Sequence, residues 1–378
     1  MSAAPSDLIV IAGGGTAGHA LPAIAVAREL VARGHDPQSI LFVGSARGLE
    51  ARLVPEAGFS IVLLPGRGIA RRVALANVAA IAGLAWATVR ALALFLRRRP
   101  SSVLSVGGYA AAPSAVAAVV LRVPLVVHEA NGVAGAANRL VGRFARAAAV
   151  AFPGTGLPRE VVTGTPVRPE VLALAGEDRA TAKARARQTL GLPEDRFVLA
   201  ATGGSLGARR INDATLGLAE LWTDRSDVAI HHVVGSRDWA SVAARVPAPD
   251  RPGLMYRAVE YESRMPEVIS AADVVLSRAG GTTVAELAVL GAPSILVPLP
   301  IAPDDHQTVQ AQRLARAGAA IVISDAELTA DRLSRELGPL VADAPRRAAM
   351  SAAATAVGHP GAAAAVAALL EEHGRGRV

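Results

Sequence analysis

The sequence contains no cysteine, and only 3% of its 378 residues are aromatic. Without cysteine the chain forms no disulfides and offers no thiolate zinc ligands, which fits a reducing cytoplasm. No segment combines aromatic and basic residues in the manner of a nucleic-acid site, so we expect no nucleic-acid partner. The first residues also lack the basic segment of a signal peptide, and we expect none.

Lysine is nearly absent as well, because Lys183 is the only one in the chain. The excess of arginine therefore reflects the overall composition and is not functional evidence by itself. The net charge of +7 still favours an anionic partner, either a phosphorylated substrate or an anionic membrane surface.

The length suits two domains of roughly 150–200 residues each. Short apolar runs alternate with alanine-rich helical runs, a pattern that predicts parallel sheets buried on both faces. The strands predicted for the first half are 8–11, 40–43, 61–64, 102–106, 125–127 and 147–151. Those predicted for the second half are 197–201, 231–234, 255–258, 274–276, 294–297 and 320–323. A linker is expected at 164–169, and the alanine-rich stretch 343–372 is expected to be helical.

Two glycine-rich turns lie about half a chain apart, and each follows an apolar strand. The first reads GGGTAGH (13–19), and the second reads GGSLGA (203–208). A strand that ends at glycines and enters a helix directs backbone N–H groups at one point, which suits a phosphate. Two such turns, each opening its own βα series, predict two similar α/β domains that face each other across a cleft.

The first turn formally matches the G-x-G-x-x-G fingerprint of dinucleotide-binding domains. That fingerprint also requires an acid at the end of the second strand, to hold the ribose. Here the strand ends in Phe42-Val43-Gly44-Ser45. NAD and FAD are therefore not expected. An Asp-x-Asp metal motif is also missing, and we predict no cofactor and no metal.

Polar residues follow three strands of the first half. His19 ends the first turn at a predicted helix start, where the positive helix end favours the neutral, proton-accepting imidazole. A packed surface histidine is the alternative. Gly108 and Tyr109 follow the next strand, and Glu129 and Asn131 the one after it. Because carboxyl ends of parallel strands meet at one edge, we expect an acceptor pocket there.

The segment SRAGGTTVAE (277–286) follows a strand of the second half. Glu286 is suited to accept hydrogen bonds from the two hydroxyls of a ribose. Its spacing from Thr283 also fits a helix capping box, which is the structural alternative. After the next strand come Asp304, Asp305, His306 and Gln307, whose side chains would reach a sugar beside the nucleotide.

Residues 73–96 form the most hydrophobic stretch, and arginines flank it on both sides. One interpretation is a buried helix of the first domain. The other is a surface helix that lies on a bilayer, with its arginines on lipid phosphates. A spanning helix, which needs about 20 apolar residues, would interrupt the α/β series.

Seven ordered motifs cover nearly the whole chain: GGTAGH (14–19), GGYAAAP (107–113), HEANGVAG (128–135), GTPVRPE (164–170), GGSLGA (203–208), SRAGGTTVAE (277–286) and DDHQ (304–307). Together they resemble the bacterial MurG family. The resemblance implies the GT-B fold, an α/β architecture of two Rossmann-like domains with parallel sheets facing a central cleft. It implies an acceptor- and membrane-binding domain over 1–166, joined by a C-terminal helix at about 355–374. The UDP-sugar donor domain would cover 167–354.

The MurG family transfers N-acetylglucosamine from UDP-N-acetylglucosamine to undecaprenyl-pyrophosphoryl-linked N-acetylmuramyl-pentapeptide. The resemblance implies this inverting transfer to the C4 hydroxyl, from lipid I to lipid II, in peptidoglycan synthesis. It also implies a peripheral protein at the cytoplasmic face of the cell membrane.

The motifs assign the following roles by resemblance. His19 and Glu129 would be catalytic. His19, Gly108, Tyr109 and Asn131 would contact the acceptor. The donor would be bound by Thr16, Ala17, Gly18, Asn131, Arg168, Ser205, Arg278, Gly281, Thr282, Thr283, Glu286 and Gln307.

The chain departs from the family pattern at Ala17, Ala130, His306 and Gln310, and these departures would alter details of sugar contact. Two other enzyme classes stay open: another GT-B UDP-sugar transferase with a lipid acceptor, and a UDP-sugar epimerase. A nucleotide-sensing scaffold protein is the non-enzyme alternative.

Overall fold

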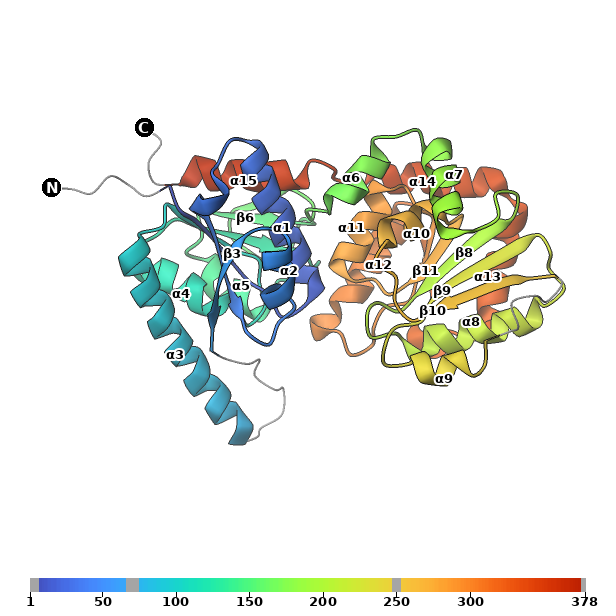
Figure 1. Cartoon of the computed structure of the whole chain (residues 1–378), viewed down its shortest axis with the longest axis horizontal. Coiled ribbons are helices and arrows are strands. Elements are labelled where there is room, and N and C mark those ends of the chain that lie inside the picture. The colour runs from blue at the N-terminus through green and yellow to red at the C-terminus, as the bar shows by residue number, and fades with distance from the viewer. Residues whose placement is uncertain (1–6, 66–74, 247–252, 375–378) are drawn as a thin grey trace. The chain divides into compact units, whose positions relative to one another are not determined.

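The computed structural model describes residues 7–65, 75–246 and 253–374. The chain divides into two compact units (Figure 1), which we call unit 1 and unit 2. Unit 1 contains Met1–Arg168 and His359–Val378, and unit 2 contains Pro169–Gly358. The domain boundaries expected from the sequence, after 166 and after 354, fall just before these.

Unit 1 is built on a parallel sheet with the strand order β3-β2-β1-β4-β5-β6-β7. The strands are β1 (Ile9–Ala12), β2 (Ile40–Ser45), β3 (Ser60–Leu64), β4 (Ser102–Ser105), β5 (Leu125–Glu129), β6 (Ala147–Val150) and β7 (Glu160–Val162). Its helices are α1 (Ala17–Ala32), α2 (Glu50–Glu56), α3 (Leu75–Arg98), α4 (Ala112–Val120), α5 (Ala136–Gly142) and α15 (Ala362–His373), with a 3-10 turn at Pro37–Ser39.

Unit 2 repeats this plan with the order β10-β9-β8-β11-β12-β13, again all parallel. The strands are β8 (Phe197–Thr202), β9 (Val228–Val233), β10 (Met255–Val259), β11 (Val274–Ser277), β12 (Ser294–Leu296) and β13 (Ala320–Val322). Its helices are α6 (Pro169–Ala175), α7 (Arg179–Leu190), α8 (Arg209–Leu221), α9 (Trp239–Ala243), α10 (Met265–Ala271), α11 (Gly281–Val289), α12 (His306–Arg316), α13 (Ala330–Ala342) and α14 (Ala344–Ala356), with 3-10 turns at Pro303–Asp305 and Asp325–Glu327.

Both sheets have the strand order of a Rossmann fold, in which the chain reverses its direction of travel beside the first strand. The reversal places a topological switch point between β1 and β4 in unit 1, and between β8 and β11 in unit 2. Ligands of such sheets bind at the carboxyl ends of the strands at this point. The expectation of two Rossmann-like α/β units is confirmed.

The core of unit 1 has two sides because successive side chains of a strand point to opposite faces. Val10 and Ala12 of β1 pack with Phe95 of α3 on one face. Ile9 and Ile11 pack on the other face, in a cluster that also holds residues of α1 and α15. Helix α15 is therefore part of unit 1, although it lies at the end of the chain (Figure 1).

Helix α15 is also tied to the end of α1 by polar contacts. Glu371 accepts a hydrogen bond of 2.6 Å from Arg33 Nη2 and lies 2.9 Å from His35 Nε2. The helical segment expected at 343–372 is confirmed as helical, but it is divided into α14 and α15. The chain leaves the helical conformation between α14 and α15, where Pro360 lacks the N–H that a helix interior requires.

Two strand expectations also differ from the structure. Strand β9 begins at Val228, three positions before the predicted start at 231, because Phe197, Val198 and Leu199 of β8 pair with the residues that were left out. Strand β7 was not predicted. It is a three-residue edge strand whose Val161 and Val162 are exposed, so it lacks the buried apolar pattern of the others.

Helix α3 covers one side of the sheet with only part of its surface. Ala87, Ala91 and Phe95 are buried against the core. The opposite face exposes Ile81, Trp86, Val89 and Leu96 to between 51% and 62%. The helix is therefore only partly buried on unit 1 and also presents an apolar surface, and its contact with a bilayer stays a prediction. Residues 73 and 74 lie outside the described residues.

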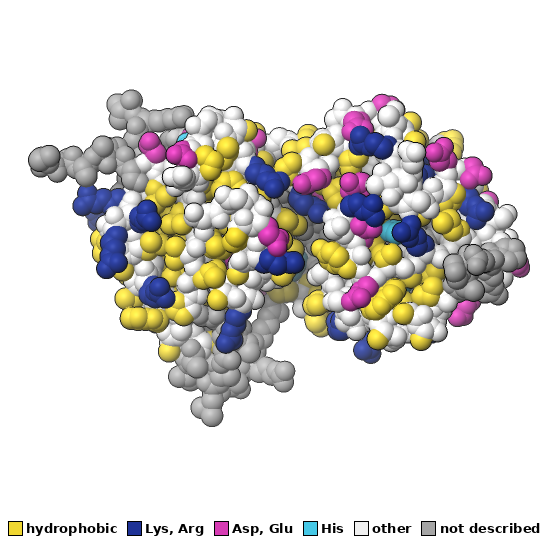
Figure 2. Space-filling model, in the orientation of Figure 1, with side chains coloured by type: hydrophobic (Ala, Val, Ile, Leu, Met, Phe, Trp, Pro, Cys, Tyr) yellow, Lys and Arg dark blue, Asp and Glu magenta, His cyan; other side chains and the backbone are white. Residues whose placement is uncertain are grey.

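By length and composition, Ala80–Arg98 is apolar enough to cross a membrane, and 22% of the tested window is buried. Arg97 and Arg98 end this segment, Arg99 follows it, and all three are exposed. Figure 2 shows hydrophobic and basic side chains intermixed on the side of unit 1 where α3 lies.

Candidate active site

The glycine turn of unit 1 leaves β1 at the switch point and enters α1. Gly15 has φ +96°, which only glycine adopts without strain. A Cβ atom at Gly14 would lie 2.0 Å from Glu50 Cδ, so only glycine fits there. Thr16 is the N-cap residue of α1, and Ala17 and Gly18 begin the helix. The predicted residues Thr16, Ala17 and Gly18 thus lie at a helix N-terminus at the carboxyl edge of the sheet.

Glu50 fixes this turn, although no motif of the sequence pointed to it. Its side chain is 1% exposed. Its carboxylate accepts hydrogen bonds from the backbone N–H of Gly15 (2.7 Å) and of Ser45 (2.9 Å). The available signal was a glutamate among small residues, since Gly44 and Gly48 leave the space that its side chain fills.

His19 lies on the first turn of α1, where its ring packs against the backbone after β4. Its Nδ1 is 3.0 Å from Thr16 Oγ1. Cβ atoms built on Gly107 and Gly108 would both lie 3.6 Å from the imidazole, which places the ring beside these glycines. The structure therefore brings His19 and Gly108 together, as expected.

Tyr109 joins the same group of loops. Its hydroxyl donates a hydrogen bond of 3.1 Å to Oγ of Ser45, the last residue of β2. Its ring lies 3.3 Å from the position of a Cβ on Gly15. Loops that follow β1, β2 and β4 thus meet around one point at the carboxyl edge.

Glu129 ends β5, and both oxygens of its carboxylate accept hydrogen bonds from the following loop and from α5. Oε1 accepts from the backbone N–H (3.0 Å) and the Nδ2 (2.8 Å) of Asn131. Oε2 accepts from the N–H of Gly135 (2.8 Å) and from Asn138 Nδ2 (3.0 Å). The Glu129 side chain is 3% exposed. Its geometry is that of a group that holds a loop in place.

His128 precedes Glu129 and is buried in β5. Burial lowers its pKa to about 4, although the neighbouring Glu129 acts in the opposite direction. This histidine is therefore neutral in the folded protein at pH 7.

The glycine turn of unit 2 leaves β8 at its switch point and enters α8. Gly204 N–H donates to Thr202 Oγ1 (3.2 Å), and Gly207 N–H donates to the carbonyl of Gly204 (2.9 Å). Ser205 at the tip is exposed, and its carbonyl accepts from the N–H of Ser236 (3.1 Å). Ser205 therefore lies at the surface of a turn whose backbone is fixed by these hydrogen bonds.

The second loop at this switch point leaves β11 and enters α11. Gly280 is the N-cap residue, and Gly281, Thr282 and Thr283 form the first turn. The capping-box alternative is excluded, because Thr283 lies inside the helix and not at its N-cap. Glu286 lies one turn further, and its side chain is 7% exposed.

Arg278 and Gln307 both hold the loop that follows β12. Arg278 Nη1 donates to the carbonyls of Val297 and Pro298 (both 3.1 Å) and forms an ion pair of 2.7 Å with Asp325. Gln307 Oε1 accepts from the N–H of Leu299 (3.0 Å). No described residue accepts a hydrogen bond from the Nε2 group of Gln307.

The structure thus gathers the predicted residues at two switch points. His19, Gly108, Tyr109 and the loop of Asn131 lie at the carboxyl edge of unit 1. Ser205, Gly281, Glu286 and Gln307 lie on loops and helix starts at the carboxyl edge of unit 2. Arg168 is the last residue of unit 1 and directly precedes α6.

Two family models match the chain, one for each unit. Residues 9–150 match the glycosyltransferase family 28 N-terminal domain, and residues 198–366 match the glycosyltransferase family 28 C-terminal domain.

Curated relatives match over almost the full length. A UDP-N-acetylglucosamine–N-acetylmuramyl-(pentapeptide) pyrophosphoryl-undecaprenol N-acetylglucosamine transferase of Mycolicibacterium paratuberculosis is 41% identical, over 97% of this chain and 89% of the relative. A protein of the same name from Nocardioides is 42% identical, over 92% of this chain and 93% of the relative. Among solved structures, MurG of Acinetobacter baumannii is similar with a TM-score of 0.76 and 28% identity, over 97% of this chain and 99% of that one. With both units matched in order and relatives of this identity, the chain belongs to glycosyltransferase family 28, in the MurG family.

Proposed function

We propose that the chain transfers N-acetylglucosamine from UDP-N-acetylglucosamine to the C4 hydroxyl of lipid-linked N-acetylmuramyl-pentapeptide, the step from lipid I to lipid II in peptidoglycan synthesis. Family membership supports the donor and the acceptor, because the relatives carry this activity in their names. The observation that carries the proposal at the site is the pair of switch points. Each has a glycine turn and a helix start at the carboxyl edge of its own sheet.

In this proposal unit 2 binds the donor. The N–H groups of the Gly203–Ser205 turn and the N-terminus of α11 stabilise the diphosphate, with Ser205, Gly281, Thr282 and Thr283 as hydrogen-bond donors. Glu286 accepts hydrogen bonds from the ribose, and Gln307 donates its Nε2–H to the sugar. Arg168 adds positive charge to the leaving diphosphate.

Arg278 acts indirectly in the donor site. Its guanidinium is engaged by the carbonyls after β12 and by Asp325. We therefore assign it to holding the α11 loop beside the loop of Gln307.

Unit 1 binds the acceptor and supplies the base. In this proposal His19 carries its proton on Nδ1, which lies 3.0 Å from Thr16 Oγ1, and Nε2 accepts the proton of the C4 hydroxyl. As the proton moves to Nε2, the C4 oxygen attacks the anomeric carbon and the bond from that carbon to the diphosphate breaks. UDP leaves, and the configuration at the anomeric carbon inverts.

The other predicted residues of unit 1 shape this pocket. Gly108 lets the backbone approach the His19 ring, and Tyr109 and Asn131 line the acceptor side, with Asn131 also reaching the donor sugar. Thr16, Ala17 and Gly18 border both substrates. We infer that Glu129 positions Asn131 and does not exchange protons, because four donors occupy its carboxylate.

The same proposal places the protein on the cytoplasmic face of the cell membrane as a peripheral protein. The exposed apolar face of α3, with Arg97 and Arg98 at its end, supports contact with an anionic bilayer that carries the lipid acceptor.

A coupled assay tests the reaction class. UDP release from UDP-N-acetylglucosamine is followed with and without a short-chain lipid I analogue, with UDP-glucose as the control donor. Transferase activity predicts UDP release only when acceptor and the correct donor are both present. A UDP-sugar epimerase would convert the sugar without acceptor, and another lipid-dependent transferase would ignore this analogue. Either result would contradict the proposal.

A further inference from the structure

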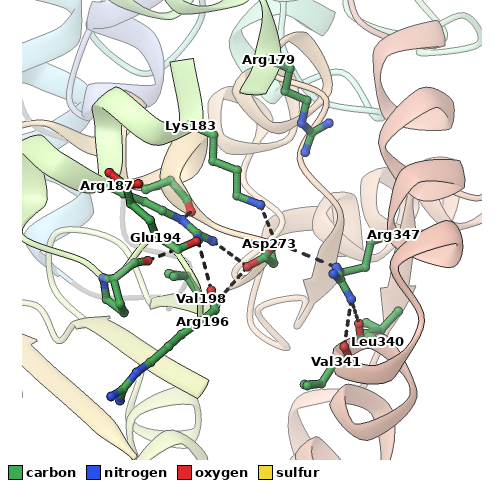
Figure 3. A network of polar contacts seen from close by, with 12 residues as sticks. Arg179, Lys183, Arg187, Glu194, Arg196, Val198, Asp273, Leu340, Val341 and Arg347 are labelled. Carbon is green, nitrogen blue, oxygen red and sulfur yellow. Dashed lines mark hydrogen bonds and ion pairs between the residues drawn. The ribbon is translucent and has the colours of Figure 1, made fainter. Parts of the chain in front are cut away.

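Unit 2 contains a basic hollow at the edge of its sheet opposite the donor loops. The hollow has a volume of about 380 Å³ and lies between α7 and α14. Asp273 at its base immediately precedes β11, whereas the Arg278–Gly280 loop follows the same strand. The charged residues that line it are Arg179, Lys183, Arg347 and Asp273 (Figure 3).

Asp273 is the carboxylate at the centre of this group, and both of its oxygens are taken. Oδ2 accepts from Arg187 Nη2 (2.7 Å) and from the N–H of Val198 (2.7 Å). Oδ1 accepts from Lys183 Nζ and lies 3.9 Å from Arg347 Nε. The Asp273 carboxylate, whose oxygens already accept hydrogen bonds, is thus the only negative charge that the described part of the chain places beside three basic side chains of the hollow, Arg179, Lys183 and Arg347. A fourth basic side chain, Arg187, contacts it from behind.

Two of the four cations have a structural explanation. Arg187 is buried and also donates to the carbonyls of Ala271, Pro193, Glu194 and Arg196. Arg347 donates to the carbonyls of Leu340 and Val341, at the end of α13. These contacts account for the positions of both guanidinium groups.

Arg179 and Lys183 have fewer hydrogen-bond partners than Arg187 and Arg347. Each has one hydrogen-bond partner among the described residues: the carbonyl of Gly291 for Arg179, and Asp273 for Lys183. Both project from α7 toward the same side of Asp273 (Figure 3). Burial lowers the pKa of Lys183, Asp273 acts in the opposite direction, and the charges of Arg187 and Arg179 lower it further. Of the residues that the structure describes, three cations and one carboxylate line the hollow, so positive charge is in excess there.

A neighbouring hollow shows that the surplus of positive charge is confined to the hollow beside Arg179. It shares Lys183, Asp273 and Arg347 with the first hollow, but it is also lined by Glu194, Asp195 and Asp227. Its charges are therefore balanced. The hollow on the Arg179 side has no carboxylate besides Asp273 among the described residues that line it.

The type of residue at position 183 also indicates which kind of anion would suit the hollow. Position 183 holds the only lysine of the chain, and the other members of the Lys/Arg class are all arginine. An ammonium is a compact charge with three donors, whereas a guanidinium is a planar fork. One lysine beside one arginine is a combination that suits the tetrahedral oxygens of a phosphate.

We propose that this hollow binds a phosphate-class oxyanion with two or more negative charges, held by Lys183 Nζ and the Arg179 guanidinium. Such an anion would neutralise the surplus that Asp273 leaves. It comes either from free inorganic phosphate or pyrophosphate, or from the phosphate of an organic monoester. The proposal does not depend on the sugar-transfer activity.

The single lysine provides a direct test. Full-length protein made with ¹³C-lysine carries one labelled side chain, and its Cε resonance reports on the ammonium. The protein is titrated at pH 7 with phosphate, pyrophosphate and glycerol 3-phosphate, in the presence of saturating UDP. Sodium chloride at matched ionic strength is the reference. We expect a saturable shift with the phosphate compounds, and tighter binding of pyrophosphate than of phosphate if free anions are the ligand.

Matched variants locate the binding. Arg179→Gln should weaken binding by about tenfold, as expected for the loss of one charge-assisted hydrogen bond. Arg245→Gln removes the same charge at an exposed ion pair with Asp213 elsewhere on unit 2 and should leave binding unchanged. A backbone amide NMR spectrum without anion, unchanged outside the neighbourhood of the substitution, shows that each variant is folded.

Three results would overturn the proposal. A shift that is linear and equal to that of chloride would mean ionic screening alone. A saturable shift that Arg179→Gln does not weaken would place the anion elsewhere. Saturation by a poly-glutamate peptide but not by any phosphate compound would assign the surface to an acidic protein segment.

Discussion

Glu50 and Glu129 are buried carboxylates that accept hydrogen bonds from backbone N–H groups of the loops at the unit 1 switch point. They hold the loops beside His19 and Asn131. The polar groups expected to meet substrate are therefore placed by acids that do not themselves face it.

The first residue-scale prediction concerns His19. His19→Ala should lower the turnover of sugar transfer by about 10²–10⁴-fold, the usual contribution of a general base. The affinity for UDP-N-acetylglucosamine should change much less, because unit 2 binds the donor in this account. Turnover is measured with saturating substrates, and donor affinity by calorimetry. His373→Ala on α15 is the control, and unchanged turnover in His19→Ala would remove the assignment.

The second prediction concerns Glu50. Glu50→Gln keeps the shape of the side chain but can accept at only one terminal atom, so the N–H of Gly15 or Ser45 loses its acceptor. We expect the free energy of unfolding to fall by about 1–3 kcal/mol, and turnover to fall more than donor affinity. Glu56→Gln, at the exposed end of the same helix, should change neither quantity. Equal behaviour of the two variants would show that Glu50 does not hold the glycine turn.

That His19, Gly108 and Tyr109 lie at one sheet edge could be predicted from the sequence, because each belongs to a segment that follows an apolar strand and the strand ends of a parallel sheet converge. Glu50 could not be predicted in this way. Its acceptor role depends on contact with Gly15, 35 positions earlier in the chain, and no local pattern encodes that contact. For Glu129 the position was predicted, but its four donors are visible only in the structure.

At the scale of elements, α3 has two apolar faces. One packs on the core through Ala87, Ala91 and Phe95, and the other exposes Trp86 and Val89. Trp86→Glu should reduce binding to vesicles that contain anionic lipids by about tenfold or more, because it replaces a large apolar group with a charge of the wrong sign. Leu221→Glu on α8, an equally exposed apolar site of unit 2, is the control in the same sedimentation assay. Equal loss in both variants would contradict a role for α3.

Elements were predictable where burial and composition agree. The central strands are fully buried apolar runs, and their positions could be predicted to within a few residues. Strand β7 is an exposed edge strand with little apolar signal. The α14–α15 segment was predicted as helical because alanine is frequent on both sides of Pro360, and composition alone does not show where the chain changes units.

At the scale of the whole molecule, buried histidines make stability depend on pH. Burial lowers the pKa of His128 and His231 to about 4, and that of His232 to about 3. Unfolded histidine titrates near pH 6.5. As the pH falls below that value, the unfolded chain binds more protons than the folded protein, so stability is lost. Each histidine contributes roughly 1.4 kcal/mol per pH unit between about pH 6.5 and pH 4.

Urea unfolding from pH 8 to pH 5 measures this dependence. The free energy of unfolding should be steady above pH 7 and fall steeply below about 6.5. His231→Leu should reduce the slope, because it removes one of the titrating groups. The change breaks no hydrogen bond of the ring, since neither ring nitrogen of His231 has a partner among the described residues. A slope that is the same in this variant would show that His231 is not one of the groups responsible.

The central claim is the transfer of N-acetylglucosamine to a lipid-linked muramyl sugar. The most direct measurement is the reaction of ¹³C-labelled UDP-N-acetylglucosamine with a short-chain lipid I analogue, followed by NMR of the product. The account predicts a disaccharide with a β-1,4 linkage, formed only when the acceptor is present and lost in His19→Ala. A free or epimerised sugar, or a product with an α linkage, would contradict the account.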